Sequence, residues 1–240
     1  MLQTKSIIEE HSGATPRECV IKLQDVSRVF QSTKGMRAQA LKDMSLDIDA
    51  GEIVAITGPS GSGKSTLLQL IGGLDRPTKG EITVAGHNLS TLHGKQLAAH
   101  RNRTIGFVFQ FFYLQPFLTV RQNIEIPMMF AGTTKASRAT RVESALQSVG
   151  LDDRMDYMPA ELSGGQMQRA AIARAIIMHP TILLADEPTG NLDSTNSKHI
   201  LELLSQIRDA YHTTIVVVTH DSTVAAWADR TIHIVDGEVA

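Results

Sequence analysis

The sequence predicts an α/β fold: a mainly parallel sheet with helices on its faces, an antiparallel β subdomain and an inserted helical lobe. Segments typical of strands and helices alternate near both ends of the 240-residue chain, whereas the middle has a mostly helical pattern. A glycine-rich loop joins an early apolar strand to a helix. These three observations favour one large domain that carries its helical lobe as an insertion.

Composition excludes several classes of protein. Hydrophobic residues make up 42% of the chain, enough to bury a substantial core. Lys and Arg total 23 against 25 Asp and Glu, which argues against a protein dominated by nucleic-acid binding. The single cysteine, Cys19, excludes an intrachain disulfide and Cys-rich zinc sites and favours a reducing, cytoplasmic setting. No stretch reads as a secretory signal or a bilayer span, so any membrane link should come through another chain.

The first half of the chain is expected to contain the antiparallel subdomain and the lobe. Residues 1–18 are polar and read as a flexible leader, so the single domain should span 19–240. Apolar runs and alternation predict strands at 19–30, 40–49, 52–57 and 80–85, and a helix at 64–71. The lobe is placed at about 91–165, and its helical pattern is interrupted by one strand at 104–109.

The second half returns to alternating strands and helices. Ser163 stands where a helix N-cap belongs, and that helix is expected to run to about Met178, before Pro180. Strands are then predicted at 181–185, 213–219 and 231–235, with helices at 194–210 and 222–228. Asp236-Gly237 offers a tight turn into a last short strand.

The glycine-rich loop has the composition of a phosphate cradle. The pattern GxxxxGK[ST] is matched in full by Gly58, Pro59, Ser60, Gly61, Ser62, Gly63, Lys64 and Ser65, and Thr66 follows. Glycines let backbone N–H groups turn inward around a triphosphate, and the helix N-terminus adds partial positive charge. Lys64 should reach the β and γ phosphates, and Ser65 should ligate Mg²⁺. The alternative is a flexible Gly/Ser loop, which the flanking strand and helix disfavour.

Two acids, Asp186 and Glu187, end a strand that is otherwise apolar. Because burial of charge is costly, carboxylates at the end of a core strand indicate a cation or a reacting water. Asp186 is therefore expected to hold Mg²⁺, and Glu187 to act as the general base for the attacking water. The alternative is an acidic loop that caps the helix near Asp193.

Two further polar residues, Gln110 and His220, also stand at predicted strand ends. A lone histidine is more often a surface residue, but His220 follows a strand beside that of the acids, which favours a contact to the γ-phosphate or the water. Gln110 could ligate Mg²⁺ or position the water.

With the segment Leu162-Ser163-Gly164-Gly165-Gln166, these residues resemble the ATP-binding cassette (ABC) family from about Val20 to the chain end. That segment matches the family's LSGGQ motif without substitution; the alternative is a mere Gly-containing N-cap. The resemblance implies a phosphate-loop NTPase core that hydrolyses ATP with Mg²⁺, catalysed by Lys64, Gln110, Glu187 and His220. It also implies that the LSGGQ helix tip faces the γ-phosphate held by a second subunit.

Two more positions gain an expected role only from this resemblance. Asp193 matches the aspartate of a dimer-contact loop, Asn191-Leu192-Asp193. Phe30 falls where an aromatic ring stacks on adenine, although a phenylalanine in a strand also suits the core. Both residues are counted among the expected nucleotide-site residues.

The segments 72–75, 110–114 and 186–193 further resemble the lipoprotein-releasing and macrolide-exporter subgroup. That resemblance implies a homodimer held at the cytoplasmic face of the inner (cell) membrane by an integral permease, one with few membrane helices and a large extracytoplasmic domain. No nucleic-acid partner is expected. The apolar run Phe111 to Leu118 is the expected seat of a cytoplasmic permease helix; the alternative is ordinary packing of the lobe.

Three other functions are compatible with parts of the sequence. A soluble ABC ATPase acting on nucleic acid or ribosomes would be expected to carry inserted coiled coils or two cassettes, and this chain has one cassette with an ordinary lobe. A kinase or GTPase would not use LSGGQ, and no Asn-Lys-x-Asp guanine motif occurs. A binding module without catalytic activity is disfavoured, because Lys64, Asp186, Glu187 and His220 are all present.

Overall fold

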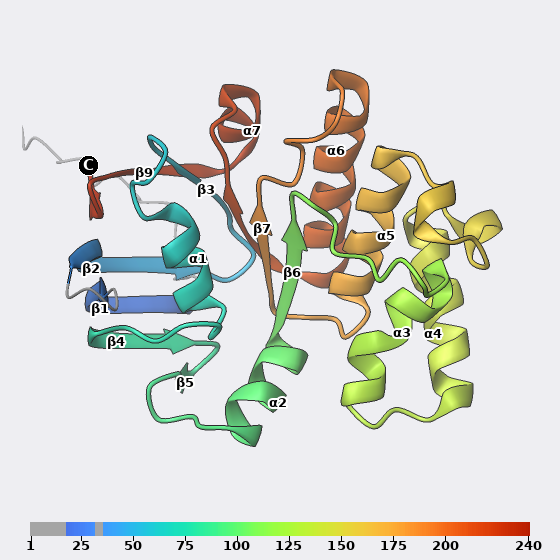
Figure 1. The fold of residues 1–240 in the computed structure, drawn as a ribbon, viewed down its shortest axis with the longest axis horizontal. Helices are drawn as coiled ribbons and strands as arrows, with labels where there is room; N and C mark the ends of the chain where they lie inside the picture. The colour runs from blue at the N-terminus through green and yellow to red at the C-terminus, as the bar shows by residue number, and fades with distance from the viewer. Residues whose placement is uncertain (1–17, 32–35) are drawn as a thin grey trace, which may run out of the picture.

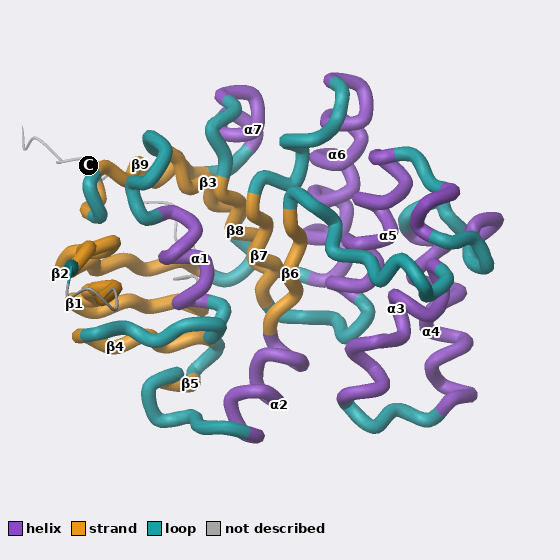
Figure 2. The backbone as a smooth tube through the Cα atoms, viewed as in Figure 1, coloured by secondary structure: helices purple, strands orange, loops and turns teal. Residues whose placement is uncertain are grey.

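The computed structural model describes residues 18–31 and 36–240, so all but the last residue of the predicted leader lies outside the described part. The described chain contains two sheets and a group of helices (Figure 1). Figure 2 separates the central strands from the helices that pack beside them. The α/β class, with its parallel core and antiparallel subdomain, is confirmed. In the described residues, no helix combines the length and the apolarity that crossing a bilayer demands.

The smaller sheet is antiparallel, with the strand order β2-β1-β4-β5. Its strands are β1 (Cys19–Gln31), β2 (Arg37–Asp49), β4 (Lys79–Val84) and β5 (His87–Asn88). The register of β1 and β2 shifts on either side of Val26, and Asp43 takes a left-handed φ of 39° there. The hydroxyl of Ser27 donates to the Asp43 carboxylate at 2.8 Å, and this bond joins the two strands beside the register shift. The bulge bends the pair near Asp43, and beyond it the predicted alternation holds, because Met44 and Ile48 are buried and Leu46 is half-buried while the residues between them are exposed.

The larger sheet has the order β10-β9-β3-β8-β7-β6, and all its neighbouring pairs are parallel except β10 with β9. Its strands are β3 (Ile53–Thr57), β6 (Ile105–Phe109), β7 (Ile182–Asp186), β8 (Thr214–Val218), β9 (Arg230–Val235) and β10 (Glu238–Val239). Ile56 and Asp186 both pair with Val218, so the carboxyl ends of β3, β7 and β8 reach one edge of the sheet. Loops that follow these strands must start side by side.

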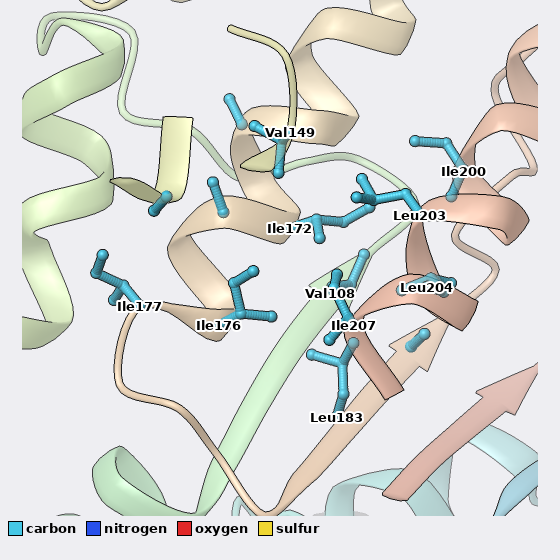
Figure 3. Close-up of a cluster of buried hydrophobic side chains, with 14 of the residues drawn as sticks. Val108, Val149, Ile172, Ile176, Ile177, Leu183, Ile200, Leu203, Leu204 and Ile207 are labelled. Carbon is cyan, nitrogen blue, oxygen red and sulfur yellow. The ribbon is translucent and has the colours of Figure 1, made fainter. Parts of the chain in front are cut away.

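Successive residues of the central strands pack on opposite faces of the sheet, in two separate hydrophobic cores. Ile53 and Ala55 belong to one core, and Val54 and Ile56 belong to the other. Figure 3 shows the first core, where Val108 and Leu183 of the sheet lie among side chains of two helices. The second core is closed by α1 (Lys64–Ile71) and the antiparallel sheet. Strands buried on both faces explain the continuous apolar runs in the sequence.

The helices beside the first core either lie in the range predicted for the lobe or flank the larger sheet. They are α3 (Val120–Phe130), α4 (Lys135–Ser148), α5 (Gly164–Ile176), α6 (Ser194–Tyr211), α7 (Ser222–Trp227) and two 3₁₀ turns, Asp152–Arg154 and Pro159–Glu161. Helix α5 contacts α3, α4, α6 and β6, so it joins α3 and α4 to the larger sheet. Between β5 and β6, α2 (Lys95–Thr104) leads into the sheet.

Two boundaries differ from the sequence prediction for physical reasons. Helix α5 ends at Ile176 rather than near Met178. His179 takes a left-handed φ of 51° directly before Pro180, a position where helical backbone is disfavoured. Strand β6, although inside the predicted lobe range of 91–165, belongs to the larger sheet. The division into a leader, one domain and an inserted lobe stays a prediction.

Candidate active site

The phosphate loop approaches the rest of the chain so closely that its glycines are required. Gly58, Gly61 and Gly63 take φ values of 143°, 79° and 106°, which side chains disfavour. A Cβ atom added to Gly58 would lie 2.0 Å from the Ile234 carbonyl oxygen, and one on Gly63 would lie 2.4 Å from that of Ala40. The loop is thus packed against both sheets at Gly58 and Gly63, which disfavours the flexible Gly/Ser loop considered as the alternative.

Lys64 opens α1 and is a buried cation with backbone partners. Its Nζ atom donates to the carbonyl oxygens of Gly58 and Pro59, at 2.9 and 2.7 Å. Among the described residues, no carboxylate forms an ion pair with it, and its charge only partly opposes the rise in the pKa of Asp186 that burial causes. An ammonium group at a helix N-terminus whose charge is not balanced by a carboxylate is suited to an incoming phosphate, and the phosphate contact of Lys64 stays a prediction.

Ser65 and Asp186 come together from α1 and β7, and they fit a magnesium ion. The Ser65 hydroxyl lies 3.5 Å from the Asp186 carboxylate. Burial, and then the neighbouring Glu187, raises the pKa of Asp186, so a bound cation would relieve an unfavourable charge. A hydroxyl and one carboxylate, completed by phosphate oxygens and water, are the hard oxygen ligands that Mg²⁺ takes in proteins.

Glu187 is the first residue after β7, and its backbone is held in a left-handed conformation with φ of 47°. Its N–H donates to the Val218 carbonyl oxygen at 2.9 Å, across to the end of β8. Its Oε1 atom lies 2.8 Å from Nδ1 of His220, which follows β8. The strand therefore ends in one acid, and the second turns out of the sheet toward the histidine. A carboxylate with a histidine partner can accept a proton from water.

Gln110 follows β6 and is joined to the loop after the acids. Its side-chain amide donates to the side-chain oxygen of Asn191 at 3.3 Å, and its backbone carbonyl oxygen accepts from the Asn191 side-chain amide at 2.9 Å. A Cβ atom on Gly190 would lie 2.9 Å from the Gln110 amide nitrogen and 3.2 Å from a Glu187 carboxylate oxygen. Gln110 and Glu187 thus flank the same glycine. Sequence reasoning did not assign Asn191 this bridging role.

The LSGGQ segment forms the tip of α5. Ser163 and Gln166 make a reciprocal capping box, with Ser163 N donating to the Gln166 side chain at 2.8 Å. Gly164 and Gly165 lie against Leu192 and Asn196, at the start of α6. A Cβ atom on Gly165 would lie 2.6 Å from the Asn196 side-chain oxygen, so any larger residue would require the Asn196 side chain to move.

Asp193 caps α6 in the described chain. Its carboxylate accepts from the backbone N–H and the side-chain amide of Asn196, at 2.9 and 2.5 Å. The backbone hydrogen bond from Asn196 is the main reason that the pKa of Asp193 is lowered. Helix α6 is thus capped by Asp193 and not by Asp186 or Glu187, and a contact of Asp193 to a second subunit stays a prediction.

Phe30 lies near the end of β1 and is 41% exposed, so it is not a core residue. This exposure is compatible with the predicted stacking on a base, which stays a prediction. Sequence reasoning missed the residues that hold this ring, Arg28 and Asp75, because their contact joins positions 47 residues apart.

Comparison with known proteins adds a family to this geometry. A family model described as ABC transporter matches residues 41–190. The chain is 47% identical over 220 residues to the macrolide export ATP-binding/permease protein MacB of Shigella flexneri, and 46% identical to that of Escherichia coli strain K12. Each match covers 92% of this chain and 34% of the relative, so the chain spans about a third of the length of these curated proteins.

Solved structures match along nearly their whole length. A dimeric post-hydrolysis structure of the ATP-binding cassette MJ0796 bound to ADP and Pi has a TM-score of 0.84 at 42% identity, covering 91% of this chain and 96% of that one. The structure of cbiO1 from Clostridium perfringens, part of the ABC transporter complex cbiONQ, has a TM-score of 0.82 at 28% identity, covering 93% and 87%.

Proposed function

The chain belongs to the ABC transporter family, and from this premise we propose that it is the ATP-binding and hydrolysing subunit of a transporter or mechanotransmission complex. ATP-driven closure of a dimer would move a separate membrane permease. The observation that carries the proposal is the meeting of three groups at one sheet edge: the phosphate loop with Lys64, the Ser65–Asp186 pair, and the Glu187–His220 pair.

Each group has a distinct task in this proposal. Lys64 exchanges its two carbonyl partners for phosphate oxygens, and Ser65 and Asp186 hold Mg²⁺. When bound, Mg²⁺ would neutralise charge on the phosphates. Glu187 accepts a proton from the attacking water, while His220 keeps the carboxylate aimed away from the sheet. Gln110, which lies beside Gly190 as Glu187 does, would orient the water.

The second half of the site would come from a second copy of the chain. The tip of α5 presents Ser163 and two glycines at a helix N-terminus, which is a ready anion site. Contacts that exist only with a γ-phosphate favour the closed dimer with ATP over ADP, because a ligand shifts an equilibrium by its differential affinity. The solved MJ0796 cassette is described as dimeric, which supports the proposal for this chain.

The proposed permease contact is the segment from Phe111 to Leu118, which we term the aromatic loop. Phe111, Tyr113 and Phe117 are 66%, 59% and 72% exposed. Arg174 of α5 donates to the carbonyl oxygens of Phe112 and Tyr113, and both residues take left-handed φ values. At the other end, the buried Asn123 accepts from the N–H of Gln115 and donates to three carbonyl oxygens.

An apolar surface on a backbone held from both ends is suited to receive a short helix of a membrane partner. The curated relatives are named as ATP-binding/permease proteins, which supports a permease as that partner. The chain would then be a peripheral subunit at the cytoplasmic face of the cell membrane. Part of the segment also meets the alternative packing role, because Leu114 packs against the first core and Phe112 and Leu118 are half-buried.

The dimer proposal is tested by the concentration dependence of ATP hydrolysis. Specific activity should rise with chain concentration, because neither site is complete in one copy. Ser163→Arg should remove activity while leaving ATP binding to the phosphate loop intact. A specific activity that stays constant down to concentrations where the chain is monomeric, by light scattering, would contradict the proposal.

A further inference from the structure

Phe30 carries a cation over one face of its ring. The guanidinium carbon of Arg28 lies 4.4 Å from the ring centroid. The Nε atom of Arg28 donates to a carboxylate oxygen of Asp75 at 2.8 Å, and both side chains are largely buried. The other carboxylate oxygen of Asp75 accepts from the N–H of Arg76 at 2.8 Å. Asp75 therefore fixes the guanidinium, and the guanidinium fixes the ring.

This arrangement stands beside the phosphate loop. Arg28 and Phe30 are two residues apart on β1 and so share a face of the strand, and they pair with Leu41 and Ala38 of β2. The phosphate loop packs on the same part of β2, because a Cβ atom on Gly63 would lie 2.4 Å from the Ala40 carbonyl oxygen and 2.8 Å from Leu41. A nucleotide whose phosphates occupy the loop would have its base within reach of this ring.

The ion pair also ties β1 to the helix of the phosphate loop. Helix α1 begins at Lys64, and Asp75 follows its end by four residues. Both ends of the helix are thereby related to the antiparallel sheet, through Gly63 at the start and through Asp75 after the end. These two contacts together fix the position of the Phe30 ring relative to the phosphate loop.

We propose that Arg28 is a positioning residue for the nucleotide base. It occupies one face of Phe30 and leaves the opposite face for the base, so that the ring has a single orientation and a single stacking side. A cation over an aromatic ring is attracted by the ring's electron density. The same cation draws density away from the free face, which favours stacking with an electron-rich purine. The inference rests on the proposed function and adds a basis for choosing among nucleotides.

The test compares ligands that share a triphosphate and differ in the base. ATP, CTP and inorganic tripolyphosphate, each with Mg²⁺, would compete against a fluorescent ADP analogue for the parent chain, Arg28→Ala, Asp75→Asn and Phe30→Ala. We expect Arg28→Ala and Asp75→Asn to weaken ATP binding about three- to tenfold. CTP should be affected less, and tripolyphosphate not at all.

A role in general stability would give a different result. If Arg28→Ala weakened ATP and tripolyphosphate equally, or still weakened ATP in the Phe30→Ala background, the proposal would be overturned. Arg28→Lys keeps a cation and should recover part of the preference for ATP. Arg230→Ala is the matched control, because it breaks an ion pair of the same length with Glu52, at 2.8 Å, and should leave every affinity unchanged.

Thermal melts of all variants separate unfolding from loss of selectivity. A parent chain that binds tripolyphosphate but shows no preference for ATP would refute the proposed base site and leave the proposed function intact. A parent chain that binds none of the three would refute the proposed function itself.

Discussion

The Nδ1 atom of His220 lies 2.8 Å from the Oε1 atom of Glu187, although the two residues are 33 positions apart and follow different strands. The parallel register of β7 and β8 places both strand ends at one edge, and the left-handed backbone of Glu187 turns its side chain toward the histidine. An acid and a histidine in contact, beside a phosphate cradle, form the proposed reacting pair.

Glu187→Gln should retain ATP binding and lose turnover. A general base contributes roughly 10²–10⁴-fold to a rate, so kcat should fall within that range. Because ATP is then not consumed, size-exclusion chromatography with ATP should show a stable dimer. A variant with near-normal turnover would remove Glu187 from this role.

His220→Ala should lower kcat at least about tenfold with little change in the KM for ATP. The reason is that the histidine contacts Glu187, the proposed general base, and not the phosphate loop. His199→Ala, which changes an exposed histidine of α6, is the control and should leave kcat unchanged. Steady-state kinetics on both variants check this, and equal effects on the two histidines would count against a specific role for His220.

Lys64→Ala should weaken nucleotide affinity about 10- to 100-fold, as expected for one charge-assisted hydrogen bond. Calorimetric titration with a non-hydrolysable ATP analogue measures this directly. Lys135→Ala, at an exposed position on α4, serves as the control. Undiminished affinity in Lys64→Ala would contradict the phosphate-binding assignment.

Asp186→Asn should stabilise the nucleotide-free chain at neutral pH while abolishing hydrolysis. Burial raises the pKa of Asp186 above its ordinary value of 3.8, so folding favours the protonated acid. The stability from that preference is present below the unfolded pKa and is lost as pH rises through the raised folded pKa. The gain in Tm from the substitution should therefore be larger at pH 7.5 than near pH 4.5.

Calorimetry of both proteins at the two pH values checks this prediction. A Tm of Asp186→Asn below that of the parent at pH 7.5 would show that ionised Asp186 stabilises the free chain. The sign of the burial effect would then be wrong.

Phe111→Glu should release the membrane partner without preventing ATP-dependent dimerisation. Phe130→Glu is the matched control, because Phe130 is 84% exposed at the end of α3 and lies outside the aromatic loop. An affinity-tagged parent chain and the control should retain a permease during purification in detergent, and Phe111→Glu should not. Loss with both variants, or with neither, would place the permease contact elsewhere.

Phe111 is a better site for this test than its neighbour Phe112. Phe112 is half-buried, and its carbonyl oxygen accepts from Arg174, so a charge at Phe112 would also disturb the loop backbone.

Much of this protein is determined locally in the sequence. The phosphate loop, the Ser163 N-cap and the order of strands and helices depend on residues within a few positions of one another, so their patterns predict them. The class of the fold follows from the same patterns, because continuous apolar strands alternating with helices bury both faces of a parallel sheet.

Only the tertiary structure decided the contacts between these elements. The Glu187–His220 pair, the Gln110–Asn191 bridge and the Arg28–Asp75 ion pair join residues 33, 81 and 47 positions apart. Each depends on strand register and on single backbone conformations, such as the left-handed Glu187, that no local preference specifies. Residues distant in the chain meet only where the whole sheet and its two cores fix their separation, so their geometry becomes known only once the chain is folded.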